Sequence, residues 1–189
     1  MRERLFIILI ILVGFISAVN ADDRRVIPLD LYLVIDCSES INNVKNDAIT
    51  WVYSNVVDRL LIEGDKVTIW SAGDKAQIIY NGEISASGGK SEIRDLLQNL
   101  ATNGNSADFS GALKDLEPRV SGTDQSRLPY TMLVASSAEK LESTLSGSSR
   151  TLLRWSRSEI YSGWQILIAE PNIAMKVTQA AASYMSSQR

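Results

Sequence analysis

The sequence predicts an α/β fold, with helices on both faces of a doubly wound, mostly parallel sheet that carries one antiparallel edge strand. Nearly continuous apolar runs, which are typical of strands buried on both faces, alternate with segments whose apolar residues have helical spacing. Two β-rich runs are separated by Gly73–Asp74, a turn signal that favours a hairpin. The chain has 189 residues, 45% of them hydrophobic, which suits one domain with a sizeable core.

Five segments are expected to form strands because they are short, apolar and rich in β-branched or aromatic residues. The clearest is LDLYLVID, which is apolar at almost every position. In chain order, the expected strands are residues 29–36, 66–72, 75–84, 130–135 and 164–169.

Four segments between or after these strands are expected to be helical. The longest, residues 42–61, has apolar side chains at helical spacing. The others are 91–100, 109–116 and 171–186, with Pro118 ending the third and Pro171 beginning the fourth.

The first residues have the pattern of an export signal. Arg2 and Arg4 precede a short apolar run, and a Val-x-Ala sequence ends at Ala21. We therefore expect residues 1–21 to be a cleavable signal peptide and residues 22–189 to be a secreted domain, either periplasmic or extracellular. An uncleaved anchor is the alternative, although the apolar run is short for a bilayer span. No later segment is apolar enough to span a membrane, so none is expected in the mature chain.

Composition excludes several classes of function. The sequence contains no histidine, which rules out Ser-His-Asp and Cys-His catalysis and histidine-ligated zinc. A net charge of −3 without a basic run gives no electrostatic surface for nucleic acid. Cys37 is the single cysteine, so no intramolecular disulfide forms. We expect its thiol to be buried, with a redox role or an intermolecular disulfide as the alternative.

Polar side chains follow the first expected strand. Asp36, Ser38 and Ser40 alternate with other residues, and this spacing directs one carboxylate and two hydroxyls toward a common point. Ligands of doubly wound folds bind beyond the carboxyl ends of the strands. Hard oxygen donors suit Mg²⁺. The alternative is structural: Asp36 and Ser40 hydrogen-bond the loop and cap the first helix.

The Asp-x-Ser-x-Ser segment after an apolar strand resembles the metal-ion-dependent adhesion site (MIDAS) of von Willebrand factor A (vWA) domains. Three further segments resemble the family in the right order, so the similarity covers nearly the whole mature chain. They are GDKVTIWSAGDKAQIIYNGEI, ADFSGALKDL and YTMLVASSAEK.

The resemblance implies a metal site built from three loops. Asp36, Ser38 and Ser40 match the first loop fully. The second loop has Ala107 where the family has a threonine, followed by a matching Asp108. The third has Ser136 and Ser137 near the position of the family's aspartate. The site is therefore incomplete, and we expect weakened Mg²⁺ binding unless Asp108 compensates.

The function expected from these residues is an exported module for protein binding, adhesion or scaffolding. A structural envelope subunit with a decayed site is the alternative, and the sequence leaves the oligomeric state open. A hydrolase is disfavoured because Ser38 and Ser40 lack a base, with nothing in the spacing to favour Lys45 or Lys66 in that role.

Overall fold

The computed structural model describes residues 25–137, 141 and 164–168. The expected signal peptide and the expected helix at 171–186 lie outside these residues. Five strands form one sheet in the order β3-β2-β1-β4-β5. Their bounds are β1 Leu29–Asp36, β2 Lys66–Ala72, β3 Ala76–Glu83, β4 Leu128–Ala135 and β5 Trp164–Ile168.

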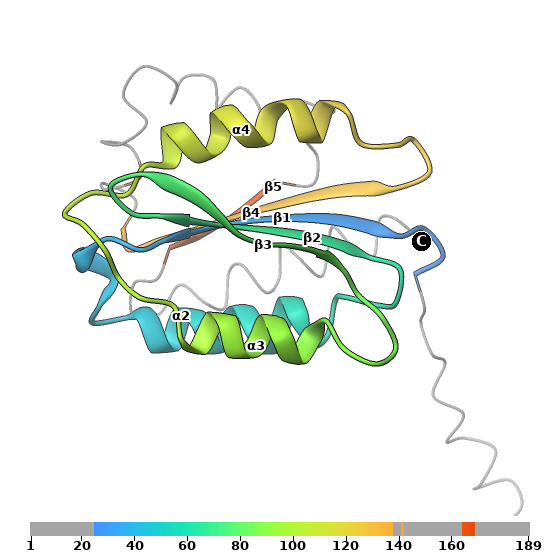
Figure 1. The fold of residues 1–189 in the computed structure, drawn as a ribbon, viewed down its shortest axis with the longest axis horizontal. Helices are drawn as coiled ribbons and strands as arrows, with labels where there is room; N and C mark the ends of the chain where they lie inside the picture. Colours follow the sequence, from blue (N-terminus) through green and yellow to red (C-terminus); the bar gives the residue numbers. More distant parts are fainter. Residues whose placement is uncertain (1–24, 138–140, 142–163, 169–189) are drawn as a thin grey trace, which may run out of the picture.

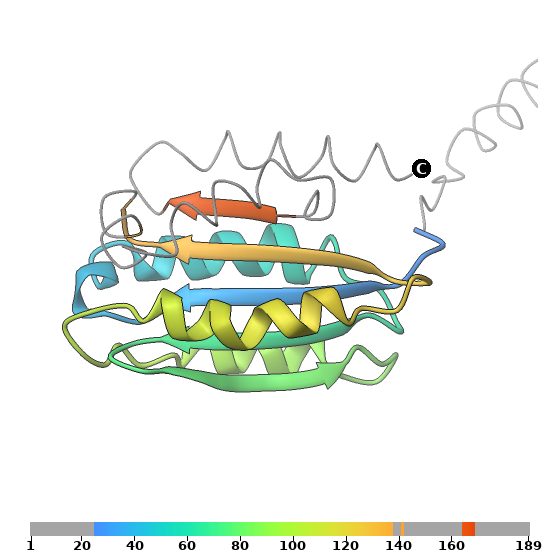
Figure 2. The ribbon, with the colours of Figure 1, turned by 90° about the horizontal axis from the view of Figure 1, so that it is seen from above.

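The sheet has the predicted mixed topology. β1 pairs in parallel with β2 and with β4, and β4 pairs in parallel with β5. β3 runs antiparallel to β2 and is an edge of the sheet, so the predicted hairpin around Gly73–Asp74 is confirmed. All eight residues of β1 are buried, as its central place requires. The exposed side chains of β3 reflect its place at the margin, which is clear in Figure 2.

Helices cover both faces of the sheet, as Figure 1 shows. α2 (Lys45–Val52) and α3 (Lys90–Gln98) lie on one face, and α4 (Phe109–Ser121) lies on the other. A short 3₁₀ helix, η1 (Glu39–Ile41), precedes α2, and a π-helical segment, η2 (Tyr53–Val57), follows it. The doubly wound fold predicted from the sequence is therefore confirmed.

Two of the predicted helix boundaries were wrong. The segment 42–61 is not one helix: Asn42 follows η1, α2 begins at Lys45, and the helix loosens into η2 after Val52. α4 continues through Pro118 to Ser121. Pro118 is exposed, so its ring lies on the solvent-facing side of the helix and not in the packed core.

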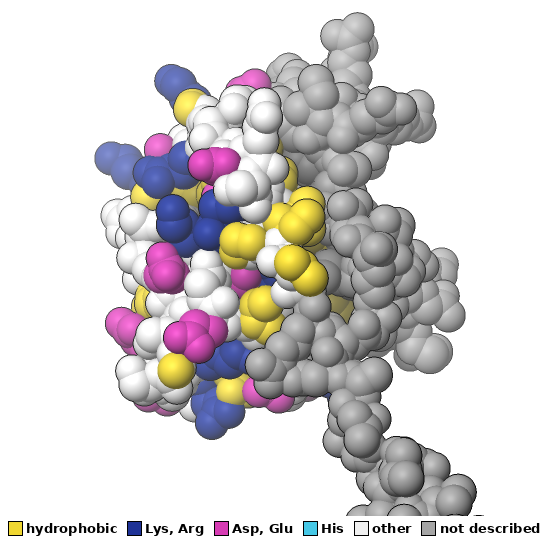
Figure 3. Space-filling model, turned by 90° about the vertical axis from the view of Figure 1, so that its right-hand side faces the viewer, with side chains coloured by type: hydrophobic (Ala, Val, Ile, Leu, Met, Phe, Trp, Pro, Cys, Tyr) yellow, Lys and Arg dark blue, Asp and Glu magenta, His cyan; other side chains and the backbone are white. Residues whose placement is uncertain are grey.

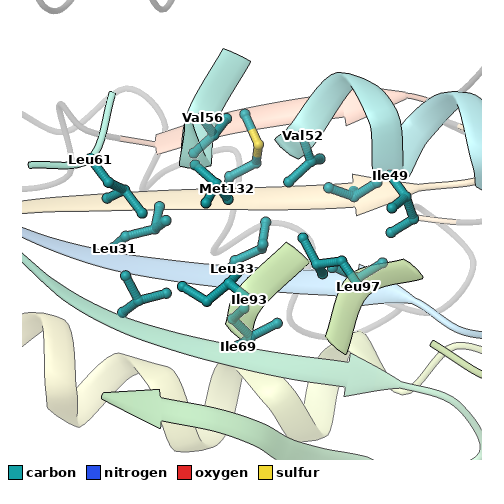
Figure 4. Packing of buried hydrophobic residues seen from close by; sticks show 14 of the residues in the cluster. Leu31, Leu33, Ile49, Val52, Val56, Leu61, Ile69, Ile93, Leu97 and Met132 are labelled. Atoms are coloured by element: carbon teal, nitrogen blue, oxygen red, sulfur yellow. The ribbon is translucent and has the colours of Figure 1, made fainter. Parts of the chain in front are cut away.

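The core has two layers because alternate residues of a strand face opposite sides of the sheet. Leu31 and Leu33 point toward α2 and α3, where they join the apolar cluster of Figure 4. Tyr32 and Val34 point toward α4. Other members of the first layer are Ile49, Val52, Ile69, Ile93, Leu97 and Met132. Other members of the second are Trp70, Phe109, Leu116 and Leu133.

Two buried ion pairs fix the amino end of β1. Asp65 is fully buried and accepts hydrogen bonds from Arg25 Nη1 at 3.0 Å and from the Leu29 N–H at 2.7 Å. Arg127 Nε donates to Asp30 Oδ1 at 2.5 Å, and its Nη2 donates to the Leu29 carbonyl at 2.9 Å. Because these arginines satisfy buried carboxylates and backbone groups together, they hold the start of the central strand in place.

Candidate functional site

The candidate site lies at the carboxyl edge of the sheet, where β1, β2 and β4 end. Asp36 is the last residue of β1, and Ser136 directly follows β4. The parallel register pairs Asp36 with Ala72 and Ile35 with Val134, which brings the three strand ends level. Parallel strands therefore deliver the loops after β1, β2 and β4 to the same edge.

The carboxylate of Asp36 organises the first loop. It is 1% exposed, and its Oδ1 accepts the Ser38 N–H at 2.8 Å and the Ser38 hydroxyl at 2.6 Å. Its Oδ2 accepts the Ser136 N–H at 3.0 Å. Three donors therefore satisfy a buried carboxylate that otherwise has a high desolvation cost.

A chain of hydroxyls leads from Asp36 to the surface. Ser38 Oγ lies 2.7 Å from Ser40 Oγ, which lies 3.1 Å from Ser136 Oγ. Ser38 is buried, whereas Ser40 is exposed. The three site residues of the first loop therefore converge as predicted, and Ser136 is the third-loop serine that contacts them. Ser137 follows it, and its carbonyl accepts the Leu141 N–H at 3.1 Å.

Backbone hydrogen bonds tie the second loop to the first. The Asn103 N–H donates to the Cys37 carbonyl at 2.7 Å, and the Glu39 N–H donates to the Gly104 carbonyl at 3.0 Å. The Cys37 N–H donates to the Ala72 carbonyl at 2.8 Å. The strand-end loops therefore form one connected surface.

Asp108 lies in this surface, but its carboxylate is held by other groups. Oδ1 accepts the Gly111 N–H at 2.8 Å, which caps α4, and Oδ2 accepts the Ala76 N–H at 3.1 Å. Capping by a side-chain carboxylate at the first turn stabilises a helix by about 1 kcal/mol. In the described residues, Asp108 thus joins α4 to β3 and makes no hydrogen bond with Asp36, Ser38 or Ser40.

Ala107 occupies the position where the family that the sequence resembles has a threonine. Its side chain is buried in the apolar layer under α4. Ser106 does not replace the missing hydroxyl, because its Oγ donates to Asp74 Oδ1 at 3.3 Å in the turn before β3. Within the described part of the chain, neither Ala107 nor Ser106 therefore brings a side-chain oxygen to the cluster around Asp36.

Sequence reasoning missed the role of Asp74. Its carboxylate accepts the Asn105 N–H at 3.0 Å, and it lies so close to Gly104 that a Cβ there would come within 2.2 Å. Gly104 also has a φ of +94°, which favours glycine. Gly73–Asp74 was predicted as a turn, but its contact with a loop about 30 positions away has no local sequence signal.

Cys37 is buried at the base of the site, as expected. Its thiol contacts the Ile35 carbonyl at 3.4 Å. Burial, with a smaller effect of the Asp36 charge, raises the pKa of the thiol to about 12. The thiol is therefore protonated at physiological pH and chemically inert in the folded domain.

The donors at this edge fall short of a complete magnesium site. Among the residues that the structure describes, Asp36 is the single carboxylate of the cluster, and both of its oxygens already accept hydrogen bonds from the chain. In the described residues, no three side chains of histidine, cysteine, aspartate or glutamate gather as a metal site requires. A tight divalent site needs more anionic ligands than this cluster offers.

The exposed apolar side chains lie elsewhere. Within the described residues the exposed large hydrophobic side chains are Val26, Ile27 and Ile78, none of which belongs to the strand-end loops. Figure 3 shows the opposite edge of the sheet, where hydrophobic side chains gather among interspersed charges of both signs. No helix within the described residues has the length and apolar character needed to cross a bilayer.

Comparison with known proteins gives the fold its name. No family model and no curated protein matches the sequence. Among solved structures, the chain is similar to a von Willebrand factor type A protein from Catenulispora acidiphila, with a TM-score of 0.50 and 11% identity over 85% of this chain and 42% of that one. It is also similar to proximal thread matrix protein 1 from the mussel byssus, with a TM-score of 0.54 and 13% identity over 82% of this chain and 46% of that one.

The chain thus spans less than half the length of these two structures. At such low identity the likeness concerns the path of the backbone. The order of strands, the antiparallel edge strand and the helices on both faces agree with it. The described domain therefore has the fold of a von Willebrand factor A domain.

Proposed function

We propose that this chain is an exported protein-binding module of the adhesion or scaffold type, which recognises its partner with the carboxyl edge of its sheet. The observation that carries the proposal is the hydrogen-bonded chain from Asp36 through Ser38 to Ser40 and Ser136. It places a prearranged pair of hydroxyls, from two loops, at an edge where ligands of such folds bind. The byssus protein with the same fold is, by its name, a matrix protein.

Recognition at this edge is proposed to proceed without a permanently bound cation. Three hydrogen bonds to the Asp36 carboxylate hold the loops together, a role that a bound metal ion would otherwise share. Calorimetric titration of the mature protein with Mg²⁺ and with Mn²⁺ should then give no binding heat. Heat that disappears in the Asp36→Ala variant would instead establish the metal-dependent version of the module.

A catalytic role is not part of the proposal. The Ser38 hydroxyl donates to the Asp36 carboxylate, and Lys45 Nζ donates to the Leu100 carbonyl at 2.9 Å. Lys66 is the first residue of β2, so it lies at the amino ends of the parallel strands, whereas the candidate site lies at their carboxyl ends. Neither lysine is placed as a base for Ser38 or Ser40. Turnover of generic ester or phosphate substrates that Ser38→Ala abolishes would overturn this part of the proposal.

The binding edge is testable by site-specific photocrosslinking in cells that produce the protein. A photoreactive side chain at Glu39, an exposed neighbour of Ser40, should capture a partner, identified by mass spectrometry. The same group at Ile78, an exposed residue of the edge strand β3, is the matched control. Capture at Glu39 that Ser40→Ala weakens supports the proposal. Equal capture at both positions, or at Ile78 alone, contradicts it.

A further inference from the structure

The sequence contains the dipeptide Asn-Gly twice, at Asn81–Gly82 and at Asn103–Gly104. The first pair lies in strand β3, and the second lies in the loop before α4 that borders the candidate site. An asparagine followed by glycine is prone to deamidation because glycine has no side chain to obstruct attack by its backbone nitrogen. Both pairs can undergo this reaction, but they differ in backbone conformation, because one lies in a strand and the other in a loop.

We propose that Asn103 is a site of spontaneous deamidation that changes the charge and the backbone of the candidate binding edge. The Gly104 backbone nitrogen attacks Asn103 Cγ, a new C–N bond closes a five-membered succinimide, and the side-chain nitrogen leaves as ammonia. Water then opens the ring at either carbonyl. One water is consumed and one ammonia released, and residue 103 becomes aspartate or isoaspartate.

The attacking atom, the Gly104 nitrogen, is not used by the hydrogen bonds of the loop. The Asn103 side chain lies against Gly73, where a Cβ would come within 2.9 Å of Asn103 Cγ, so the amide carbon is packed on one side. The ring contains Asn103 Cα, Cβ, Cγ and C together with Gly104 N. The hydrogen bonds that anchor the loop use other atoms, namely the Asn103 N–H and the Gly104 carbonyl. Asn103 is exposed. In the part of the chain that the structure describes, the Gly104 N–H donates no hydrogen bond, so attack breaks none.

Asn81 is held in a conformation that opposes the same reaction. Its side-chain Oδ1 accepts the Thr68 hydroxyl at 3.1 Å. In the ladder between β2 and β3, Asn81 pairs with Thr68 and Gly82 pairs with Val67. Ring closure there requires the extended strand to distort, at a cost in cross-strand contacts. Asn81 is therefore an internal control with the same neighbour and a similarly exposed side chain.

Conversion of Asn103 alters the candidate site in two ways. It adds one negative charge to a residue whose N–H bonds the Cys37 carbonyl, directly beside Asp36. Isoaspartate also adds a methylene to the main chain between the two anchoring hydrogen bonds of this loop. The effect on partner recognition rests on the proposed function, whereas the reaction itself does not.

The test follows both asparagines in the intact mature protein during incubation in mildly alkaline buffer at physiological temperature. Peptide mapping by mass spectrometry separates the three forms of each site. We expect Asn103 to convert about tenfold faster than Asn81, which corresponds to about 1.4 kcal/mol in barrier height. Short synthetic peptides containing each Asn-Gly pair should convert at similar rates, since neither is folded.

Equal rates in the folded protein, or a faster rate at Asn81, would overturn the proposal. So would an unchanged Asn103 in protein incubated until the peptides have converted. Asn103→Gln should remove the acidic product of this site and leave conversion at Asn81 as before. Gly104→Ala is not a suitable control, because its Cβ would meet Asp74 at a positive φ. If Asn103→Asp binds the captured partner as wild type does, the modification stands and its role in recognition fails.

Discussion

Ser136 donates its backbone N–H to Asp36 Oδ2 at 3.0 Å, across 100 positions of sequence. This hydrogen bond joins the loop after β4 to the end of β1. The other oxygen of the same carboxylate accepts the N–H and the hydroxyl of Ser38. A single buried side chain therefore holds two loops of the candidate site together through contacts within the chain.

Asp36→Ala should lower the free energy of unfolding by at least about 2 kcal/mol. The substitution leaves the N–H groups of Ser38 and Ser136 without their acceptor, and each unsatisfied buried donor costs about 1–3 kcal/mol. Ser40→Ala is the control, with an expected cost below about 1 kcal/mol because its hydroxyl is exposed. Urea denaturation measures both values, and equal losses would contradict the structural role of Asp36.

Arg127→Ala should be the more destabilising of two matched arginine substitutions. It leaves Asp30, which is 8% exposed, without its cation and removes donors to the Leu29 and Gly64 carbonyls. Removing one partner of a buried ion pair costs about 3–5 kcal/mol. Arg59→Ala, at an exposed position, should cost less than about 0.5 kcal/mol. Thermal unfolding of both variants provides the comparison.

The Cys37 thiol should react slowly with a thiol reagent until the protein unfolds. Because its pKa is raised to about 12, the thiolate is scarce at neutral pH. Because the folded state disfavours the thiolate, Cys37 contributes fully to the free energy of unfolding below the pKa of an unfolded cysteine, which is about 8.5. That contribution declines as the pH rises toward 12, the pKa of the thiol in the folded state. Reaction in urea should be fast, and rapid labelling of the native protein at neutral pH would contradict the buried geometry.

The Ser136→Asp variant should acquire Mg²⁺-dependent stability. It restores the carboxylate that the resemblance implies, whereas a threonine at 107 would place its side chain in the apolar layer under α4. The new carboxylate at 136 would lie near Asp36, and the two would need a cation between them. Ligand binding to the folded state raises the melting temperature with ligand concentration. The same variant carrying Asp36→Ala should show no such dependence. A melting temperature indifferent to Mg²⁺ in both would count against the resemblance at the level of the site.

The strands were predictable because their signal is local. β1 is apolar throughout, and the chain's alternation of strand and helix restricts the sheet to few topologies. The first loop was predictable for the same reason, since Asp36, Ser38 and Ser40 are two positions apart. The break between η1 and α2 escaped prediction because apolar spacing continues across it, and Pro118 was taken as a stop although it is exposed on α4.

The second loop was less predictable because tertiary contacts decide its direction. The sequence places Asp108 at the correct edge, but its carboxylate is turned toward Ala76 by the hairpin that precedes β3. Asp74, which was read as part of a turn, determines the position of Asn105. Neither contact has a signal within a short window of sequence. The choice between Ser136 and Ser137 likewise required the register of β4 against β1.

The central place of β1 has a consequence for how the domain folds. Its parallel neighbours β2 and β4 begin at Lys66 and Leu128. One side of β1 can therefore pair only with β4, which lies about 100 residues later in the chain. Closing a loop over such a separation loses chain entropy before any favourable contact forms. Contacts between residues far apart in sequence therefore slow folding. During synthesis, the apolar strand 29–36 remains unpaired on one side until residue 135 is available. Chaperones that bind extended apolar segments have access to it in that period.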